Sequence, residues 1–344
     1  MLNWLQRRWF LLFLVVLIPG GFAIGSHLGT GRVHEFSDRI GPRVPTALVM
    51  LVLFLMSVTL NNSRLRAALS SPGPVLWASF VNMGLIPLAA WPLSRLQLTT
   101  DFTVGLLIAA SVPCTMAAAS VWTRKAGGND AVSLLVTLLT NGACFVVTPL
   151  WLQLTMPPLG DAASSYGIDA AFLMKKLIVS ALLPILAGQS ARALPWIASR
   201  ADQHKTLLGV IAQSCILVLV FWESTKAGPQ VAGGALAGGV SAIALVWTSC
   251  IVLHLAAMAL AVAAARAMRF DRADRSAIAF AASQKTLPIG VYLAATLSAA
   301  GAPLAVLPML MYHASQLFVD TTVADRLLAG ANRESEVIAS SSRR

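Results

Sequence analysis

The sequence predicts an all-α polytopic membrane protein with ten transmembrane helices. Of its 344 residues, 57% are hydrophobic and only 11% are charged, whereas a soluble domain carries about 25% charged residues. Apolar stretches recur along nearly the whole chain and are long enough to cross the ~30 Å hydrocarbon core of a bilayer. Because no region is both polar and long enough to fold separately, we expect one transmembrane domain at 1–326. A disordered cytoplasmic tail rich in Ser, Arg and Glu is expected at 327–344.

The first expected helix follows Arg7 and Arg8. An arginine pair ahead of an apolar run is also typical of a twin-arginine export signal, but a chain with many later spanning segments has little need of that route. The pair also satisfies the positive-inside rule, and we therefore expect a retained helix. The full set of expected spans is 9–29, 44–61, 73–93, 102–123, 129–153, 170–191, 205–223, 233–265, 274–299 and 303–325.

The loops between segments are short, so segments that follow each other in sequence are expected to be neighbours in space. Two of the later segments have distinctive features. The sixth, 170–191, carries Lys175 and Lys176 near its start, and their long side chains are expected to reach the membrane interface. The eighth, 233–265, is the longest apolar run, so it must tilt or project from the bilayer.

Lysine and arginine concentrate on one side of this ten-helix arrangement. The other side holds only Arg32, Arg39, Arg43, Arg95 and Lys226. This bias predicts a multi-pass protein of the inner (cell) membrane with both termini in the cytoplasm. The cytoplasmic set is Arg7, Arg8, Arg64, Arg66, Arg124, Lys125, Arg192, Arg200, Lys205, Arg266, Arg269, Arg272, Arg275 and four arginines of the tail.

Ten helices divide into two sets of five, about 9–153 and 170–325, and a duplicated five-helix unit gives halves of opposite orientation. The fourth and ninth segments are possible counterparts, since each places proline, small residues and hydroxyls at mid-depth, around Pro113 and around Pro288. A proline removes a backbone donor, and carbonyls that lose their helical partner must find a hydrogen bond or a cation. The alternative for either segment alone is a simple proline kink.

Lys285 is the most informative residue of the ninth segment, because it lies far from both ends of the helix. A charge at mid-bilayer costs at least ~2.5 kcal/mol. Snorkelling to an interface is the alternative, but the depth of Lys285 makes it difficult. We therefore expect this lysine to face a cavity or a partner and to have a functional role.

The tenth segment holds His313 and Asp320, seven residues apart on one helical face. His313 is either functional or a hydrogen-bonded structural histidine. Asp320 lies near the expected cytoplasmic end, where a pair with Arg326 would account for it. His254 in the eighth segment is interpreted as structural.

The fifth segment carries a polar series, which consists of Ser133, Thr137, Thr140, Asn141 and Thr148. Ser133, Thr137 and either Thr140 or Asn141 recur every three to four residues and share a face. Hydroxyl and amide oxygens on one face suit sodium, and the same pattern serves ordinary hydrogen bonding between membrane helices. Both readings stay open from the residues alone.

Several runs resemble the bile acid:sodium symporter family, and the likeness spans nearly the whole chain. It is closest to the branch of sodium-dependent transporters related to the seventh human member. The runs are Phe54–Leu60 for the second helix, Phe80–Pro87 for the third, Pro113–Ser120, Ala126–Asn129, Ser133 with Thr137, and Thr148–Pro149 for the fourth and fifth, Gln284–Thr286 for the ninth and Tyr312–His313 for the tenth.

The resemblance implies a fold of ten helices in two inverted five-helix repeats, with core and panel domains and with broken fourth and ninth helices that cross. It also implies alternating-access transport coupled to sodium. The sodium ligands that it implies are Ser120, Ser133 and Thr137 in one site, and Asn82, Gln284 and the region of Ala281 and Ser283 in the other. The implied substrate contacts near the crossing are Thr115, Lys285, Thr286 and His313.

Two departures from the family pattern concern charge. A glutamate of the ninth helix that serves both sodium sites is replaced, at the matching position, by Phe280, and an asparagine of the crossing is replaced by Lys285. Two like charges ~4 Å apart repel by about 4 kcal/mol at an effective dielectric constant of ~20. A sodium ion beside the ammonium group is therefore unfavourable, unless Lys285 points away or is neutral.

Three hypotheses of function follow. In the first, Lys285 holds the carboxylate of an organic anion and sodium binds the remaining oxygens. In the second, the ammonium group replaces a sodium ion, giving a sodium-independent or proton-linked carrier. In the third, the protein is a non-transporting membrane regulator.

Other classes of function are disfavoured. The chain has no phosphate-binding glycine loop, no paired membrane carboxylates and no metal-binding cluster, so we expect no enzyme and no cofactor beyond a sodium ion. The formal charge of +11 orients helices and predicts no nucleic-acid partner. Arg269, Arg272 and Arg275, with Asp271 and Asp274, are interpreted as a solvated cluster in a cytoplasmic loop. The expected partners are a small organic anion and membrane lipids, and the oligomeric state stays open.

Overall fold

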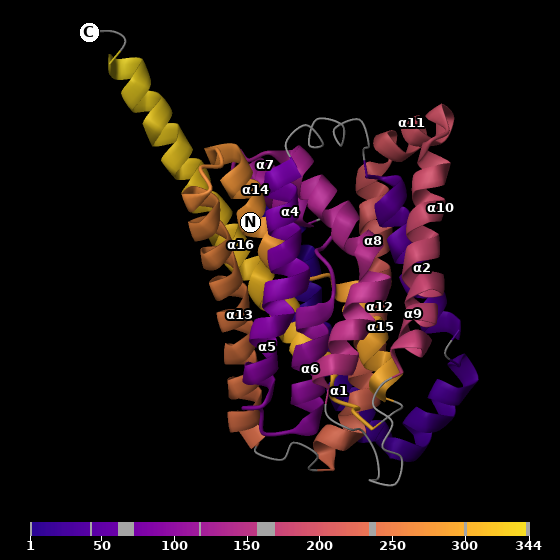
Figure 1. The fold of residues 1–344 in the computed structure, drawn as a ribbon. Coiled ribbons are helices and arrows are strands. Elements are labelled where there is room, and N and C mark those ends of the chain that lie inside the picture. The colour runs from indigo at the N-terminus through magenta and orange to yellow at the C-terminus, as the bar shows by residue number, and fades with distance from the viewer. Residues whose placement is uncertain are drawn as a thin grey trace.

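The structure is a computed structural model, which describes residues 2–41, 43–60, 72–116, 118–156, 169–233, 239–298 and 301–341. All regular elements in these ranges are helices (Figure 1). In chain order they are α1 (Leu2–Ile40), α2 (Arg43–Val58), α4 (Pro72–Phe80), η2 (Val81–Leu85), α5 (Ile86–Ser94), α6 (Thr100–Ser111), α7 (Ala118–Lys125), α8 (Asp130–Thr155), α9 (Ala170–Leu177), η3 (Ile178–Leu182), α10 (Leu183–Arg192), α11 (Pro195–Gln203), α12 (Lys205–Ala232), α13 (Gly239–Ala267), α14 (Arg272–Ser283), α15 (Leu287–Ser298) and α16 (Val306–Ser341).

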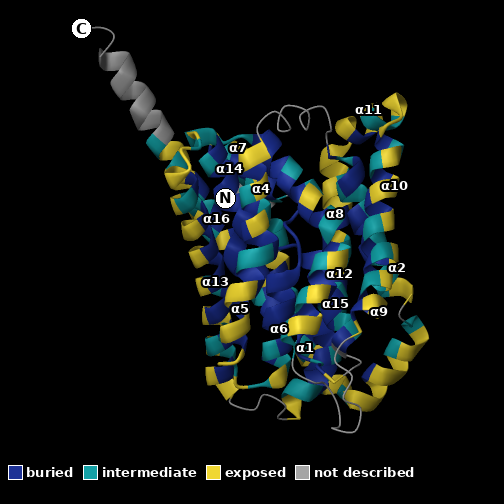
Figure 2. Cartoon of the chain, in the orientation of Figure 1, coloured by how far each residue is buried: buried dark blue, intermediate teal, exposed yellow. Residues whose placement is uncertain are grey.

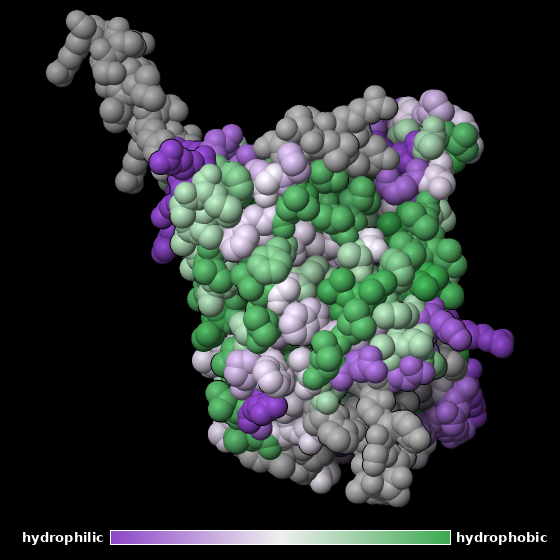
Figure 3. All heavy atoms as spheres, viewed as in Figure 1, coloured by the Kyte–Doolittle hydropathy of each residue, from purple (hydrophilic) through white to green (hydrophobic). Residues whose placement is uncertain are grey.

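Among the described residues, six helices are long and apolar enough to cross a membrane. Two shorter apolar helices, α2 and α6, accompany them. Green, hydrophobic side chains cover the waist of the molecule, and purple ones gather toward its ends (Figure 3). The predicted class of an all-α, multi-pass membrane protein is therefore confirmed. The six candidate spans are Leu12–Ile40, Pro72–Ser94, Asp130–Thr155, Ala170–Arg192, Lys205–Ala232 and Gly239–Ala267.

Some helix bounds differ from those predicted. The first helix does not end at 29: it bends at Gly29, where φ is 73°, and a second helical stretch continues to Ile40. Glycine tolerates this left-handed φ because it has no Cβ. The run assigned to the eighth helix is divided, since α12 extends to Ala232 and α13 begins at Gly239.

Two further differences lie on the side of the molecule that carries α11, here called the α11 side (Figure 1). The short helix α11 was not predicted, and Arg192 of α10 forms an ion pair with its Asp202 at 2.9 Å. α16 continues as a helix to Ser341, past the boundary expected at 327. Arg64 and Arg66 lie outside the described residues.

The helices pack in two groups. α1, α2, α9, η3, α10 and α12 contact one another and are called the α12 group; α4 to α8, α13, α14 and α16 form the crossing group. α15 contacts both, through α2 and α12 on one side and α6 and α16 on the other. Buried residues concentrate in the middle of the assembly, whereas exposed residues cover the outer helices (Figure 2).

The α12 group depends on a close approach of α1 and α12. A Cβ added at Gly228 would lie 2.5 Å from the carbonyl oxygen of Phe22, and one at Gly25 would lie 2.0 Å from that of Thr225. The hydroxyl of Ser26 donates to the carbonyl of Gly228 at 2.9 Å. Small residues at such an interface let membrane helices approach closely, which is how they gain packing energy.

Replacing Gly228 with valine is therefore expected to destabilise the protein. The side chain would collide with backbone atoms of α1, and overpacking of this kind costs about 1–3 kcal/mol. The measurement is thermal unfolding in detergent. The control is Gly209→Val on the same helix, where a Cβ meets nothing within 4 Å. Equal melting temperatures for the two variants would contradict the close approach.

Candidate functional site

The fourth and ninth segments are both interrupted midway, as the prolines and polar residues predict. α6 ends at Ser111 and α7 begins at Ala118, while α14 ends at Ser283 and α15 begins at Leu287. The two breaks meet, because the backbone N–H of Thr286 donates to the carbonyl of Pro113 at 2.9 Å. The backbone groups that lack helical partners at both breaks are therefore brought to one place inside the protein.

Each carbonyl of the first break, from Ser111 to Thr115, accepts a hydrogen bond from another segment. Membrane helices cannot leave such groups unpaired in hydrocarbon. Three donors come from the polar series of α8, so this series serves helix–helix hydrogen bonding. The pairs are Thr148 with Ser111 (2.7 Å), Lys285 with Val112 (2.9 Å), Thr286 N–H with Pro113 (2.9 Å), Asn141 with Cys114 (2.8 Å) and Thr137 with Thr115 (3.4 Å).

The carbonyls of the second break are satisfied in the same way. The side-chain amide of Asn82 donates to the carbonyls of Ala281, Ala282 and Gln284, at 3.2, 3.1 and 2.8 Å. The hydroxyl of Tyr312 donates to the carbonyl of Ser283 at 2.9 Å, and the side chain of Gln316 donates to that of Lys285 at 3.0 Å. The carbonyls proposed as sodium ligands thus already accept protein donors.

The side chain of Lys285 is fully buried, with 0% of its surface exposed. Its ammonium nitrogen lies 2.6 Å from the carbonyl oxygen of Asn82, 3.4 Å from Oδ1 of the same residue and 2.9 Å from the carbonyl of Val112. An ammonium group has three donors. All three are therefore directed at protein oxygens.

The sequence explains why the carbonyl of Asn82 is available. Asn82 lies in the π-helical turn η2, in which Ile86 N–H bonds to Val81 O, five residues earlier. The same register would pair Asn82 O with the N–H of residue 87, but residue 87 is proline and has none. Lys285 supplies the missing donor.

Asp320 is the other buried charge-bearing group at this site. Sequence reasoning assigned it to the helix end and to Arg326, and the structure corrects both assignments. Asp320 is 0% exposed. Its carboxylate accepts from Nε2 of Gln284 at 2.5 Å and lies 2.9 Å from Nε2 of His254.

His254 is fully buried between two acceptors. Its Nδ1 lies 3.2 Å from the carbonyl of Ser283, opposite the contact of its Nε2 with Asp320. Each contact is a hydrogen bond when the ring nitrogen that faces the acceptor carries a proton. α13 and α16 are thereby joined through polar groups to the end of α14.

His313 lies where α16 meets α1 of the α12 group. Its ring packs edge-on against Phe10, with centroids 6.2 Å apart. Its Nδ1 lies 2.8 Å from Nε2 of Gln316, whose Oε1 accepts the backbone N–H of Lys285 at 2.8 Å. A hydrogen-bonded chain therefore connects the interface of the two helix groups to the crossing.

The first set of predicted sodium ligands has three different partners. Ser120 bonds to the carboxylate of Asp130 and accepts from Arg124 at 2.8 Å. The hydroxyl of Ser133 lies 2.6 Å from that of Thr123. Thr137 turns toward the carbonyl of Thr115. In the second set, Ser283 donates from its hydroxyl to the carbonyl of Ala279 at 2.8 Å.

Two cavities lie at opposite ends of α12, one between the helix groups and the other beside α1, α12 and α15. The cavity on the α11 side measures about 150 Å³ and is lined by Met116, Ser120, Arg124 and Lys205 among others. The cavity at the other end measures about 400 Å³, and His34, Lys226, Gln230 and Ala295 are among its lining residues. Among the described residues, no carboxylate lines either one, although Lys226 pairs with Glu223 at 2.8 Å.

Sequence reasoning missed Gln316, Asn141 as a backbone partner, Asp130 and the pairing of Asp320. The sequence did contain a signal that could have identified Gln316. His313, Gln316 and Asp320 form a polar stripe at helical spacing on an otherwise apolar segment, and such a stripe in a membrane helix points inward.

Comparisons with known proteins identify a family and several relatives. Residues 8–329 match the model of the SBF-like CPA transporter family. An uncharacterized protein of Pseudomonas aeruginosa is 28% identical over 254 residues, covering 73% of this chain and 73% of its own.

Two further relatives carry functional names. A protein of Escherichia coli K12 named as a symporter, YfeH, is 27% identical over 290 residues, which is 82% of this chain and 83% of its own. Sodium/bile acid cotransporter 7-B of Xenopus laevis is 22% identical over 338 residues, covering 94% and 92%. The resemblance noted from the motifs is thereby confirmed, and the chain belongs to the SBF-like CPA transporter family, as a membrane transporter and not an enzyme.

Proposed function

We propose that the protein moves a small organic anion across the membrane by alternating access, and that the ammonium group of Lys285 takes the place of one sodium ion. The observation that carries this proposal is the set of oxygens around its nitrogen, two carbonyls and one amide oxygen within 3.4 Å. Oxygens of this kind would otherwise suit a sodium ion. With a fixed cation among them, a second cation would meet a repulsion of about 4 kcal/mol at ~4 Å.

The same contacts argue against Lys285 as the group that holds the substrate. Its three donors are already directed at Asn82 and Val112. The residues that remain available for an anion near the crossing are Thr115, Thr286 and His313. The hydroxyl of Thr286 is buried and has no hydrogen-bond partner among the described residues.

An anionic substrate fits the charges of the two cavities. Lys205 and Arg124 line the one on the α11 side, where Arg124 pairs with Asp130 at 3.0 Å, and Lys226 lines the other. Clefts lined by one sign of charge raise the local concentration of the opposite ion. Opening each cavity in turn, by movement of the α12 group against the crossing group, would expose the site to one side at a time.

The finer topology is part of this proposal. Ten spanning segments in two inverted five-helix repeats, about 9–153 and 170–325, are supported by the matching breaks in segments four and nine. The excess of lysine and arginine on the α11 side supports cytoplasmic termini and an inner-membrane location. In this arrangement the α12 group corresponds to the panel and the crossing group to the core.

Sodium symport is the second candidate function, favoured by relatives whose names describe sodium cotransporters. Its site would be the hydroxyls near α7 and α8, from Ser120, Ser133 and Thr137. The two candidates differ in whether sodium stabilises the folded protein, since a ligand at 100 times its dissociation constant adds about 2.7 kcal/mol.

The test of coupling is thermal unfolding in sodium, potassium and choline chloride at equal ionic strength. We expect sodium to give the wild type no selective stabilisation. Lys285→Asn removes the ammonium group and frees the oxygens that it contacted, so we expect sodium to stabilise this variant selectively. Lys176→Asn is the control, because Lys176 stacks on Phe172 at 4.8 Å, outside the crossing. Sodium stabilisation of the wild type that Thr137→Val removes would overturn the sodium-independent proposal in favour of symport.

Transport itself is tested in proteoliposomes. Carboxylates and sulfonates that raise the melting temperature are offered as radiolabelled substrates, with amines of similar size as controls. Uptake of an anion under an imposed gradient is the expected result. Binding without any flux would instead support a membrane regulator. Uptake that follows an imposed pH gradient would identify proton linkage as the form of coupling.

A further inference from the structure

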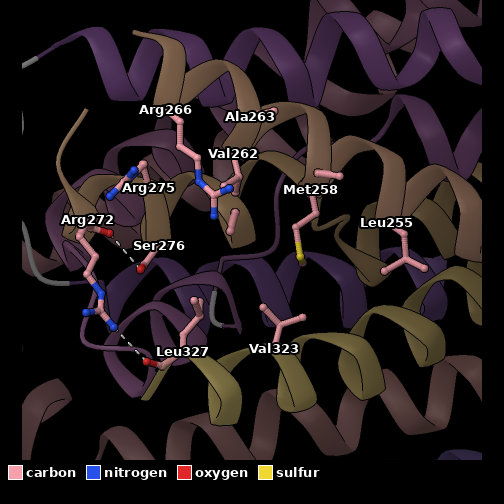
Figure 4. A pocket seen from close by; sticks show the side chains of 12 residues that line it. Leu255, Met258, Val262, Ala263, Arg266, Arg272, Arg275, Ser276, Val323 and Leu327 are labelled. Atoms are coloured by element: carbon pink, nitrogen blue, oxygen red, sulfur yellow. Dashed lines mark hydrogen bonds between the residues drawn. The ribbon is translucent and has the colours of Figure 1, made fainter. Parts of the chain in front are cut away.

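A third cavity among the described residues lies away from the crossing and has no part in the transport proposal. It measures about 620 Å³ and lies between α13, α14 and α16 on the α11 side. Figure 4 shows Leu255, Met258 and Val323 at one end of it and arginine side chains at the other. The cavity therefore has an apolar part within the helix bundle and a cationic part at the helix ends.

The cationic part consists of Arg266, Arg272 and Arg275. Sequence reasoning interpreted Arg272 and Arg275 as members of a solvated loop cluster, but both lie on α14, half-buried. One guanidinium nitrogen of Arg272 donates to the carbonyl of Leu327 at 3.3 Å, which holds this side chain against α16 (Figure 4). The three cations thus come from two neighbouring helices and surround one opening.

Of the acidic residues on these helices whose side chains the structure describes, none lines this cavity. Asp271 accepts the backbone N–H of Asp274 at 2.7 Å, and Asp274 accepts from Asn129 at 2.8 Å. Asp325 is paired with Lys125, and Asp320 with His254 and Gln284. The described lining residues therefore include three arginines and no carboxylate.

The position of the cavity beside an apolar outer surface indicates which kind of anion would bind there. The outer face of α13 beside the cavity is apolar and exposed, with Leu255 at 44% and Leu260 at 50%, as expected of a surface that meets hydrocarbon. A soluble anion would use only the arginines. A molecule with an anionic head group and acyl chains would use the arginines and the apolar part together.

We propose that this cavity binds an anionic phospholipid, with the phosphate at Arg266, Arg272 and Arg275 and an acyl chain along Met258 and Val323. Arginine pairs with phosphate through two parallel hydrogen bonds. Basic pockets between membrane helices are typical sites for such head groups. The bound lipid would tie the start of α14, whose other end forms the crossing, to α13 and α16.

The experiment uses delipidated full-length protein in detergent, with phosphatidylglycerol and phosphatidylcholine as probes. Binding is measured by native mass spectrometry and by the rise in melting temperature. The variant is Arg266→Gln with Arg275→Gln, which leaves the Arg272–Leu327 contact in place. The control is Arg32→Gln with Arg200→Gln, which removes the same charge at exposed positions outside the cavity.

We expect phosphatidylglycerol to bind the wild type and the control equally, and the cavity variant at least about tenfold more weakly. Phosphatidylcholine should bind all three weakly and alike. Equal binding of phosphatidylglycerol to the two variants, or equal binding of both lipids to the wild type, would overturn the proposal. Displacement of the lipid by millimolar glycerol phosphate would do so too, since it would identify a site for a soluble anion. Melting temperatures without lipid check that each variant is folded.

Discussion

Replacing Lys285 with methionine is expected to reduce transport by about 100-fold or more while leaving the protein folded. Truncating one partner of a buried, hydrogen-bonded charge pair lowers the free energy of the interaction between the joined parts by about 2–5 kcal/mol. In a carrier that interaction belongs to the transport cycle, because the ammonium group of the second break bonds to Val112 of the first break and to Asn82 of η2. Initial rates of anion uptake into proteoliposomes measure the effect.

Stability is expected to change little in this variant because two terms oppose each other. The carbonyls of Asn82 and Val112 lose their donor, at about 1–3 kcal/mol each. Removing a buried ammonium group recovers several kcal/mol of desolvation. A melting temperature near that of the wild type, with transport lost, would separate this role from simple support of the fold.

Lys176→Met is the matched control. It removes the same chemical group from a side chain that stacks on Phe172 and is only partly buried. Such a site contributes about 0.5–1 kcal/mol, so uptake should stay within a few-fold of the wild type. Normal uptake by Lys285→Met would show that the ammonium group is dispensable and would remove the central argument of the proposed function.

The helix breaks could be predicted from the sequence because their signals are local. Pro113, Lys285 and the polar residues beside them stand within a few positions of each other in apolar segments. Local composition is enough to show that a helix cannot continue undisturbed there. The depth of Lys285 could be predicted because it lies far from both ends of its apolar segment in the sequence.

The partners of these groups could not be predicted, because they depend on packing between distant helices. Asp320 was assigned to a helix end because the tenth segment was expected to leave the membrane near 325, whereas α16 runs to Ser341. His254 was interpreted as structural because nothing in its own segment marks it. Only the packing of α13 against α14 and α16 brings it to Asp320 and Ser283.

Replacing Asp320 with leucine is expected to destabilise the protein by about 3–5 kcal/mol, the cost of removing one member of a buried pair. The change leaves the ring of His254 and the amide of Gln284 without their acceptor inside the bundle. Asp320→Asn keeps an oxygen for one of these donors, so its loss should be smaller, about 1–2 kcal/mol. Thermal and denaturant unfolding in detergent measure both.

Asp325→Leu tests whether the effect belongs to the buried site. The same substitution is made one turn further along α16, at a side chain that is 57% exposed and paired with Lys125. An exposed ion pair contributes about 0–1 kcal/mol, so this variant should unfold close to the wild type. Equal losses at 320 and 325 would show that leucine harms α16 in general and would contradict the pairing of Asp320 with His254.

The asparagine variant also addresses the charge of the crossing. Lys285 adds a positive charge to this site, and Phe280 stands where the resembling family has a glutamate. Asp320 is a buried carboxylate bonded to Gln284, the residue next to Lys285. If the carboxylate compensates that charge, Asp320→Asn should lose transport although most of its stability remains. If Asp320→Asn transports normally, hydrogen bonding alone explains the geometry of the pair, and Lys285 is balanced by the carbonyl dipoles around its nitrogen.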